Sequence, residues 1–165
     1  MNPSLKRLIK DEIEVQDEVY NKLFSVRPKV ATVPTSTGST TQEKNMYSWE
    51  GVIYGPADSP YEGGTFYVAI DIPEDYPLKP PLFKLCTRIY HPNIKTDGQI
   101  CLDILKRQWS PALGISRALL SIIVLLSEPN ARDPLNAAAG NQYLANKDDF
   151  EMMARAWTAE YAMGL

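Results

Sequence analysis

Apolar positions near the N-terminus recur at helical spacing and predict a helix. The stripe consists of Leu5, Ile9, Ile13, Tyr20 and Leu23. Asn2 and Pro3 suit the start of such a helix, because asparagine is a good cap and proline fits the first turn. Arg7 and Asp11 stand at i,i+4 on the other face, a spacing typical of an exposed helical ion pair. We expect the apolar stripe to pack on the core.

Four later segments have the pattern of β-strands. They are the β-branched stretch 29–33, the alternating stretches 46–54 and 66–72, and the apolar stretch 82–86. Turns of hairpin length join them, which predicts a four-stranded antiparallel meander. Residues 34–45, between the first two strands, are poor in apolar side chains and rich in serine and threonine, so we expect a flexible hairpin loop there.

The last third of the chain has helical patterns. Residues 115–127 are apolar nearly all round, as in a helix buried against a sheet, and they are too few to span a bilayer. A weaker helix is expected at 135–144, and Asn146 caps a final helix. The apolar stripe of that final helix consists of Phe150, Met153, Ala154, Trp157 and Tyr161. The order of elements predicts a single α+β domain over residues 1–165.

The segment 76–81 contains three prolines and cannot be a central strand, because proline lacks the amide donor. We expect a rigid surface loop with a cis bond between Tyr76 and Pro77. Leu78 lies at its tip. A leucine held out by prolines is a candidate contact for a partner, although single exposed leucines are also ordinary.

Composition narrows the function classes. The chain has 165 residues, 44% of them apolar, with a net charge of −3, so it can bury a core and is not suited to general binding of nucleic acid or anionic membranes. No apolar run is long enough for a membrane span, and the N-terminus has no apolar signal core. We expect a cytoplasmic or nuclear monomer. Lys6, Arg7 and Lys10 form a basic corner, either a solvated face or a partner contact.

The candidate chemistry lies in residues 91–111, which hold the sole histidine, His91, and Cys101. One histidine and two cysteines are too few for an ordinary zinc site, so no metal is expected. Both cysteines are expected to be reduced thiols. A loop thiol such as Cys101 is a candidate nucleophile, whereas Cys86, in a strand pattern, is expected to be structural. His91 is then either a catalytic base, oriented by Asn93 or an aspartate, or a brace that holds the loop.

Several long motifs resemble those of the ubiquitin-conjugating enzymes. They read HPNI, GQICLDIL, QWSPAL, YGPADSPYEGGTF, DYPLKPP and EPNARDPLN. The resemblance spans residues 2–24 and 46–163 and is greatest to the small, broadly acting, ubiquitin-specific subgroup. It implies a fold of one N-terminal helix, a four-stranded antiparallel meander, an active-site loop and C-terminal helices.

The resemblance also implies roles for individual residues. Cys101 matches the cysteine that carries ubiquitin as a thioester, and Asn93 matches the asparagine that stabilises the oxyanion or orders the loop. Asp133 and Asp103 match acidic residues near the incoming lysine and the cysteine. Because exchange of thioesters needs no strong base, the resemblance makes His91 a loop-shaping residue rather than a catalyst.

The implied partners are ubiquitin, the activating enzyme and ligases of RING or HECT type. No cofactor is expected to bind directly, since ATP is consumed by the activating enzyme. The matching contact positions are Lys6, Arg7, Lys10, Leu78, Ser110, Pro111 and Ala112. This chain departs from the subgroup at Leu78, where phenylalanine is usual, at Arg132, where a second acid is usual, and at Gly114, where a capping threonine is usual. Residues 25–45 are longer than in compact members and do not align.

Three alternatives remain at this point. The first is a conjugating enzyme for another ubiquitin-like modifier. The second is a non-catalytic variant of the same fold, against which Cys101 itself argues. The third is a cysteine hydrolase that uses Cys101, His91 and Asn93.

Overall fold

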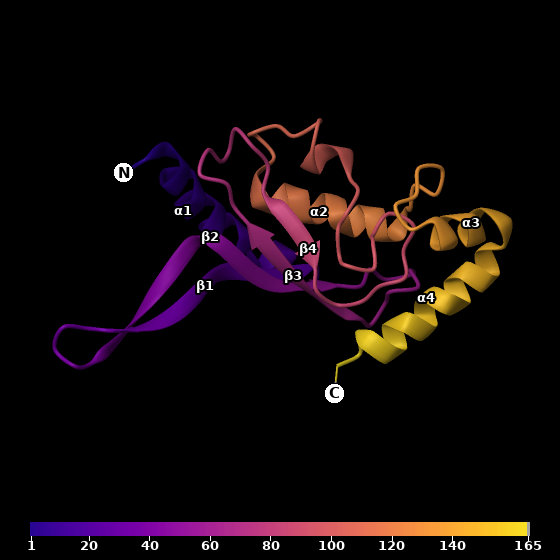
Figure 1. Cartoon of the computed structure of the whole chain (residues 1–165), viewed down its shortest axis with the longest axis horizontal. Helices are drawn as coiled ribbons and strands as arrows, with labels where there is room; N and C mark the ends of the chain where they lie inside the picture. The colour runs from indigo at the N-terminus through magenta and orange to yellow at the C-terminus, as the bar shows by residue number, and fades with distance from the viewer. Residues whose placement is uncertain (165) are drawn as a thin grey trace.

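The computed structural model describes residues 1–164 and has the expected α+β architecture (Figure 1). The helices and 3-10 turns are α1 (Pro3–Val15), η1 (Glu18–Tyr20), η2 (Asp103–Leu105), α2 (Gly114–Ser127), α3 (Ala137–Ala145) and α4 (Lys147–Tyr161). The strands are β1 (Phe24–Pro34), β2 (Thr40–Tyr54), β3 (Thr65–Asp71) and β4 (Leu82–Leu85). They form one antiparallel sheet in the order β1-β2-β3-β4, which confirms the meander.

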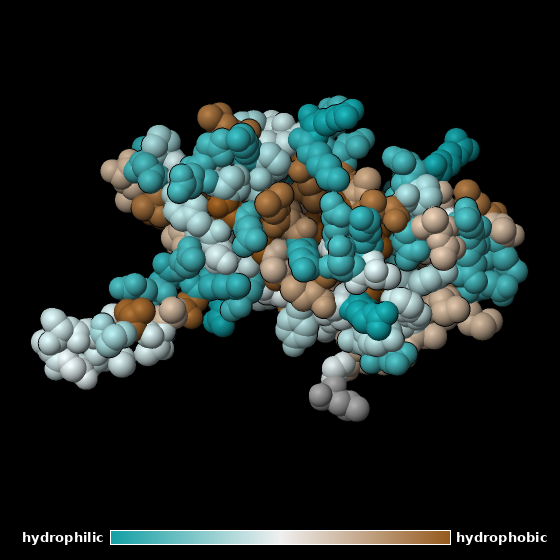
Figure 2. Space-filling view, viewed as in Figure 1, coloured by the Kyte–Doolittle hydropathy of each residue, from teal (hydrophilic) through white to brown (hydrophobic). Residues whose placement is uncertain are grey.

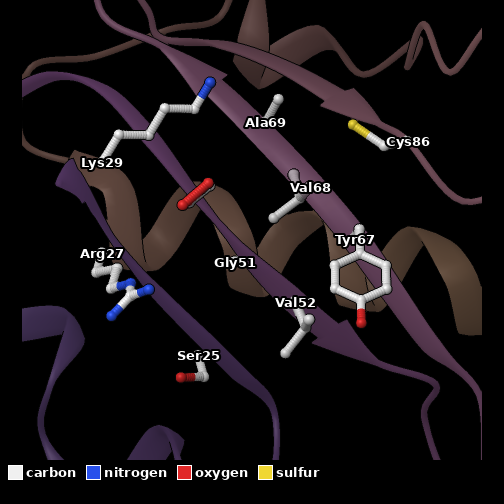
Figure 3. A pocket seen from close by; sticks show the side chains of 10 residues that line it. Ser25, Arg27, Lys29, Gly51, Val52, Tyr67, Val68, Ala69 and Cys86 are labelled. Carbon is white, nitrogen blue, oxygen red and sulfur yellow. The ribbon is translucent and has the colours of Figure 1, made fainter. Parts of the chain in front are cut away.

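The core lies between one face of the sheet and α2, which runs behind the strands in both Figure 1 and Figure 3. Alternate residues of β2 and β3 face it, among them Trp49, Ile53, Phe66 and Ile70, all fully buried. This is the period-2 pattern that the sequence predicted. The same alternation leaves the other face of the sheet without a helix over it (Figure 3).

Helix α1 begins as expected, with the Asn2 side chain accepting a hydrogen bond from the Leu5 amide at 2.7 Å. The predicted packing face is wrong, however, because Ile13 is 71% exposed and Ile9 also lies on the surface.

The residues of α1 that are buried are Ser4, Leu8, Asp11 and Val15. Leu8 and Val15 supply the apolar contact, and Asp11 is bound by Arg7 of the same helix and by Tyr76, which lies far away in the sequence. The helix also ends at Val15, earlier than the stripe implied, so Tyr20 and Leu23 belong to the segment that leads into β1.

The loop predicted at 34–45 is mostly strand. Residues 29–34 pair with 40–45, so only 35–39 form the turn, with Gly38 at a φ of +84°. Because β3 pairs with β2 only from Ser48 onward, these paired residues form a two-stranded ribbon that projects from the sheet (Figure 1). Figure 2 shows the projection as a pale surface of intermediate hydropathy. Both of its faces are largely exposed, so no apolar alternation marked it as strand, although threonine favours strands. Its flexibility stays a prediction.

The proline segment forms a surface loop, and its Tyr76–Pro77 bond is cis, as expected. Tyr76 is buried, whereas Leu78 is 76% exposed at the surface. The indole N–H of Trp109 donates to the Pro77 carbonyl at 2.8 Å and joins this loop to the segment that precedes α2. The two segments are therefore adjacent, although they are distant in sequence.

The C-terminal helices are confirmed. Most of α2 is buried, with Val124 as its exposed apolar exception. Asn146 caps α4 by accepting from the Asp149 amide at 3.2 Å. Phe150 and Ala154 of the predicted α4 stripe are buried, but Met153 is exposed. Within residues 1–164, no helix is both long and apolar enough to cross a membrane.

Candidate active site

A tight turn at residues 95–98 precedes Cys101 and sets the direction of the chain that leads to it. The Gly98 amide donates to the Lys95 carbonyl at 2.9 Å, and the Lys95 amide donates to the Gln99 carbonyl at 2.9 Å. Gly98 has a φ of +94°, and a Cβ there would lie 2.0 Å from the Leu85 carbonyl oxygen. Only glycine fits this position, because any side chain would meet both the strain and the clash. The turn therefore holds the approach to Cys101 against the end of β4.

Cys101 is half-buried, and its amide donates to the Asn93 carbonyl at 2.9 Å. The short bridge between Ile94 and Ile100, both buried, holds the two segments side by side. Cys86 lies just beyond β4 and is exposed, so the expectation that it is a packed structural thiol is wrong. The strand pattern 82–86 continues one residue too far, and its last side chain turns to the surface. Both cysteines are free thiols.

His91 is fully buried and both of its ring nitrogens are engaged. Nδ1 accepts from the Asn93 amide at 2.9 Å, and Nε2 donates to the Leu125 carbonyl at 2.8 Å. Burial lowers the pKa of His91 from its ordinary 6.5 to about 4, so the ring is neutral at physiological pH. A catalytic base must reach the proton that it removes. His91 is aimed at α2 instead, which supports the brace reading and removes the base of the hydrolase alternative.

Asn93 joins the active-site loop to the segment that precedes α3. Its Oδ1 accepts from the Asn130 amide at 2.8 Å, and its Nδ2 donates to the carbonyls of Asn130 at 2.8 Å and Asp133 at 3.3 Å. The neighbouring Pro92 carbonyl accepts from two further amides of that segment, those of Leu135 and Asn136. Asn93 is buried, so these bonds order the wall of the site. The partner residue Asn130 was missed, because only its backbone takes part.

Both candidate acids are exposed. Asp133 is on the segment that Asn93 holds, and Asp103 begins η2, two residues after Cys101. Across residues 1–164, no hydrogen bond or ion pair engages the carboxylate of Asp133. The N-cap of α3 is Asn136, whose side chain accepts from the Ala139 amide at 3.2 Å, so Asp133 is not a capping residue.

The described residues contain no group of three histidine, cysteine, aspartate or glutamate side chains that could hold a metal ion. The site therefore consists of a half-buried thiol on a fixed backbone, a neutral buried histidine and asparagine behind it, and free carboxylates at its rim.

Comparison with known proteins shows which family has this sequence and fold. The sequence profile of the family described as ubiquitin-conjugating enzyme matches residues 18–158. The chain belongs to the ubiquitin-conjugating enzyme family. Its fold resembles that of a Plasmodium yoelii protein assigned as a ubiquitin conjugating enzyme, with a TM-score of 0.85, 40% identity, and coverage of 100% of this chain and 99% of the other. It also resembles a Toxoplasma gondii ubiquitin conjugating enzyme domain, with a TM-score of 0.77, 38% identity, and coverage of 96% and 98%.

Family membership implies interaction with ubiquitin, with an activating enzyme and with ligases in general, and the thioester mechanism is general to ubiquitin-conjugating enzymes. The resemblance found in the sequence is thus confirmed at the level of the family. Assignment to the small, broadly acting subgroup stays a prediction.

A shallow apolar groove of about 390 Å³ is lined by α2 and by the segment that follows Cys101. Its lining includes Leu102, Ile104, Leu120, Val124 and Leu125. Leu102 directly follows Cys101, so the groove begins one residue along the chain from this candidate cysteine. An apolar groove close to Cys101 offers area that a bound partner can bury, and burial of apolar area favours association.

The positions expected to meet an activating enzyme or ligases gather at one end of the molecule. We call Lys6, Arg7, Lys10, Leu78 and Ser110–Ala112 the partner surface. The bond from Trp109 to the Pro77 carbonyl brings the proline loop next to Ser110, and Leu78, Ser110, Pro111 and Ala112 are all exposed.

The three basic residues of the partner surface differ in their environment. Lys6 and Lys10 are exposed, but Arg7 is paired through Nε to Asp11 Oδ1 at 3.2 Å. Asp11 is only 2% exposed, so this is not the surface ion pair that the i,i+4 spacing suggested.

Gly114 was expected to serve as a helix cap, and the structure gives it another reason. It has a φ of +65°, and a Cβ there would lie 3.0 Å from an Arg7 guanidinium nitrogen and 3.1 Å from Asp11 Oδ1. The residue that precedes α2 is Leu113, without a side-chain cap. Gly114 therefore permits a left-handed backbone and close approach of α1 to the start of α2.

A separate pocket of about 520 Å³ lies on the open face of the sheet (Figure 3). Arg27 and Lys29 from β1, Tyr67 from β3 and the exposed Cys86 line it. None of the candidate catalytic residues belongs to its lining, so the pocket is distinct from the active site.

Proposed function

We propose that this chain accepts ubiquitin from the activating enzyme as a thioester on Cys101 and passes it on with the help of a ligase. The observation that carries the proposal is the position of Cys101. Its amide is bound by the Asn93 carbonyl and its side chain is half-buried. An apolar groove begins at the next residue, Leu102, and the exposed Asp103 follows directly after that. A reactive cysteine has to be both held and accessible, and this one is.

In the first step the Cys101 sulfur attacks the thioester carbonyl that joins ubiquitin to the activating enzyme. A new sulfur–carbon bond forms, the old one breaks, and the activating enzyme's sulfur leaves as a thiolate. The Cys101 thiol gives up its proton to solvent, and the leaving thiolate takes up a proton from solvent in turn. Because a thioester replaces a thioester, the step is nearly balanced and needs no strong base. A neutral His91, with both nitrogens occupied, is compatible with this chemistry.

In the second step a lysine amine of the substrate attacks the same carbonyl and Cys101 leaves. Lysine has an ordinary pKa of about 10.4, so the neutral amine is scarce at physiological pH. We assign Asp133 to orienting the amine and accepting its proton, with Asp103 as a second acid on the cysteine side. A ligase of HECT type would instead offer a cysteine sulfur, and one of RING type would hold the lysine substrate near the thioester.

Asn93 has two roles to fill in this scheme. In the uncharged enzyme its amide orders the loop. To donate to the developing oxyanion it would release the longer of its two donor bonds, that of 3.3 Å to the Asp133 carbonyl. A positioned side-chain donor of this kind is worth roughly 100-fold in rate in oxyanion-hole enzymes.

The proposal includes the cellular setting expected from the sequence: a monomer in the cytoplasm or nucleus that binds no cofactor directly. The second candidate is conjugation of another ubiquitin-like modifier, favoured by the same cysteine and groove. The choice between modifiers rests on contacts with the activating enzyme rather than on Cys101.

One assay tests both candidates. The protein is incubated with activating enzyme, ATP and ubiquitin, and parallel reactions contain other modifiers with their own activating enzymes. Non-reducing gels should show a band shifted by one ubiquitin that thiol reductant removes. Cys101→Ser should give a weaker, reductant-resistant oxyester, and Cys86→Ser, the matched control, should charge normally. A shift with another modifier only would replace ubiquitin in the proposal, and no shift with any would refute carrier activity.

A further inference from the structure

Three side chains that meet beneath the partner surface have no part in the chemistry at Cys101. We call Arg7, Asp11 and Tyr76 the Arg7 cluster. The Asp11 carboxylate takes the Arg7 Nε–H on one oxygen, at 3.2 Å, and the Tyr76 hydroxyl on the other. The Arg7 guanidinium lies over the Tyr76 ring, 5.9 Å from its centroid. The cluster therefore closes on itself, with each member touching the other two.

Stability alone does not account for this cluster. Burial raises the pKa of the Asp11 carboxyl, which means that the folded protein bears a desolvation cost for its charge. Apolar residues of similar volume often stabilise a fold as well as a buried ion pair does. Buried ionic groups are better suited to fixing one geometry, because they have few satisfactory arrangements.

The cluster is connected to both exposed segments of the partner surface. Tyr76 directly precedes Pro77, whose carbonyl accepts the Trp109 indole N–H at 2.8 Å. The rings of Tyr76 and Trp109 lie 6.2 Å apart. Leu78 follows Pro77 and Ser110 follows Trp109, so each exposed contact is one residue away from the Trp109–Pro77 bond that lies next to Tyr76. On α1, Lys6 and Lys10 flank the cluster and point outward.

We propose that the Arg7 cluster is a positioning device, which sets Leu78 and the Ser110–Ala112 turn relative to the exposed lysines of α1 so that the partner surface is preformed. Arg7 then acts on partners through Asp11 and Tyr76, not as a charge offered to them. The proposal rests on the proposed function, because it takes the activating enzyme as the partner that reads this surface. Preformed surfaces bind more tightly because less has to be ordered on association.

Gly114 belongs to the same arrangement. Its missing side chain leaves room for Arg7 and Asp11 at the start of α2, as the close approaches of its hypothetical Cβ show. The cluster therefore also sets α1 against the helix that follows the Ser110–Ala112 turn.

The test removes one bond of the cluster without removing its packing. Tyr76→Phe deletes the hydroxyl that binds Asp11, and Asp11→Asn removes the charge. Tyr47→Phe is the matched control, because the Tyr47 hydroxyl also ties α1 to the sheet, through Ser4 Oγ at 2.6 Å, but does not touch the cluster. For each variant, the KM of the protein as a substrate of the activating enzyme is measured with ubiquitin and ATP. Discharge of the charged protein to free lysine is measured separately.

Tyr76→Phe and Asp11→Asn should each raise KM about fivefold, the size expected for loss of one hydrogen bond, and leave discharge to free lysine unchanged. The effect of the double variant should be less than the sum of the two single effects, since both changes act on the same cluster. Tyr47→Phe should match the wild type. On the uncharged protein, the backbone amides of Tyr76 and Leu78 and the Trp109 indole N–H should exchange with solvent faster in Tyr76→Phe than in Tyr47→Phe.

Equal KM values in wild type and Tyr76→Phe, additive effects in the double variant, or equal exchange in the two tyrosine variants would overturn the inference and leave the proposed function intact. Failure of the wild type to charge would instead refute the proposed function, and the role of the cluster toward the activating enzyme with it.

Discussion

Cys101 is located by backbone bonds and by two neutral side chains, whereas Leu78 is located by a buried ionic cluster. Behind Cys101, His91 and Asn93 are buried and bind mostly main-chain groups. Behind Leu78, the Arg7 cluster joins a cation, a carboxylate and a phenol through their side chains. The two residues thus rest on separate supports, and under the proposals above chemistry and docking should respond to different substitutions.

The largest effect is expected at Asn93. Asn93→Ala removes the hydrogen bonds to the segment that precedes α3, and it also removes the proposed oxyanion donor. Single-turnover discharge to free lysine should therefore slow roughly 100-fold. Asn130→Ala is the control, because Asn130 contributes its backbone amide and carbonyl only, and its rate should stay within twofold of wild type, an estimate for a change that removes no bond. A normal rate in Asn93→Ala would mean that the wall is held without it.

His91 should make stability depend on pH. Its pKa is about 4 in the folded protein and 6.5 ordinarily, so between these values the unfolded chain binds more protons. The His91 contribution is complete above pH 6.5 and is lost as the pH falls toward 4, by roughly 3 kcal/mol between pH 7 and pH 4.

The measurement is chemical denaturation at several pH values, with His91→Gln as the non-titrating reference. The raised pKa of Asp11 acts in the opposite direction and is common to both proteins, so the difference between them isolates His91. Parallel pH profiles for the two proteins would contradict the assignment.

Asp133 should affect transfer but not charging. Asp133→Ala is expected to form the thioester normally and to discharge to free lysine about tenfold more slowly, because a positioned carboxylate no longer orients the amine. Asp148→Ala, an exposed acid in the first turn of α4, controls for the change in charge and should discharge normally. If the two variants discharge at the same rate, Asp133 has no special part in the mechanism.

The smallest effect is expected on the docking side. Leu78→Ala should raise the KM for the activating enzyme about threefold, as expected for loss of one exposed apolar contact, and leave discharge to free lysine unchanged. Leu82→Ala removes a similarly exposed leucine outside the partner surface and should change neither quantity. Slower discharge in Leu78→Ala would show that docking and chemistry are not separate.

The sequence predicted the positions of the helices and strands better than it predicted which of their faces are buried. Strand β3 and the 46–54 part of β2 followed from apolar alternation, and helix α2 followed from a nearly continuous apolar run. The buried face of α1 did not, since Asp11 is brought inside by Tyr76, a contact between residues far apart in the chain. Within the ribbon, the strand predicted at 29–33 is confirmed, but residues 40–45 were predicted as loop because their two exposed faces leave no apolar signal.

Cys101 and its neighbours could be found from motifs, but the role of His91 could not be decided from sequence. A histidine in this position could serve either as a catalytic base or as a residue that holds the loop. Only its contacts to the Leu125 carbonyl and the Asn93 amide distinguish the two roles. The Arg7 cluster likewise needed the structure, because Arg7 and Asp11 have the spacing of an ordinary surface pair.

The most direct test of the separation is the discharge of a preformed ubiquitin thioester on Cys101 to free lysine, measured side by side for wild type, Asn93→Ala and Tyr76→Phe. We predict that Tyr76→Phe discharges at the wild-type rate and that Asn93→Ala is slowed roughly 100-fold. Equal slowing of both variants, or a normal rate for Asn93→Ala, would contradict the account.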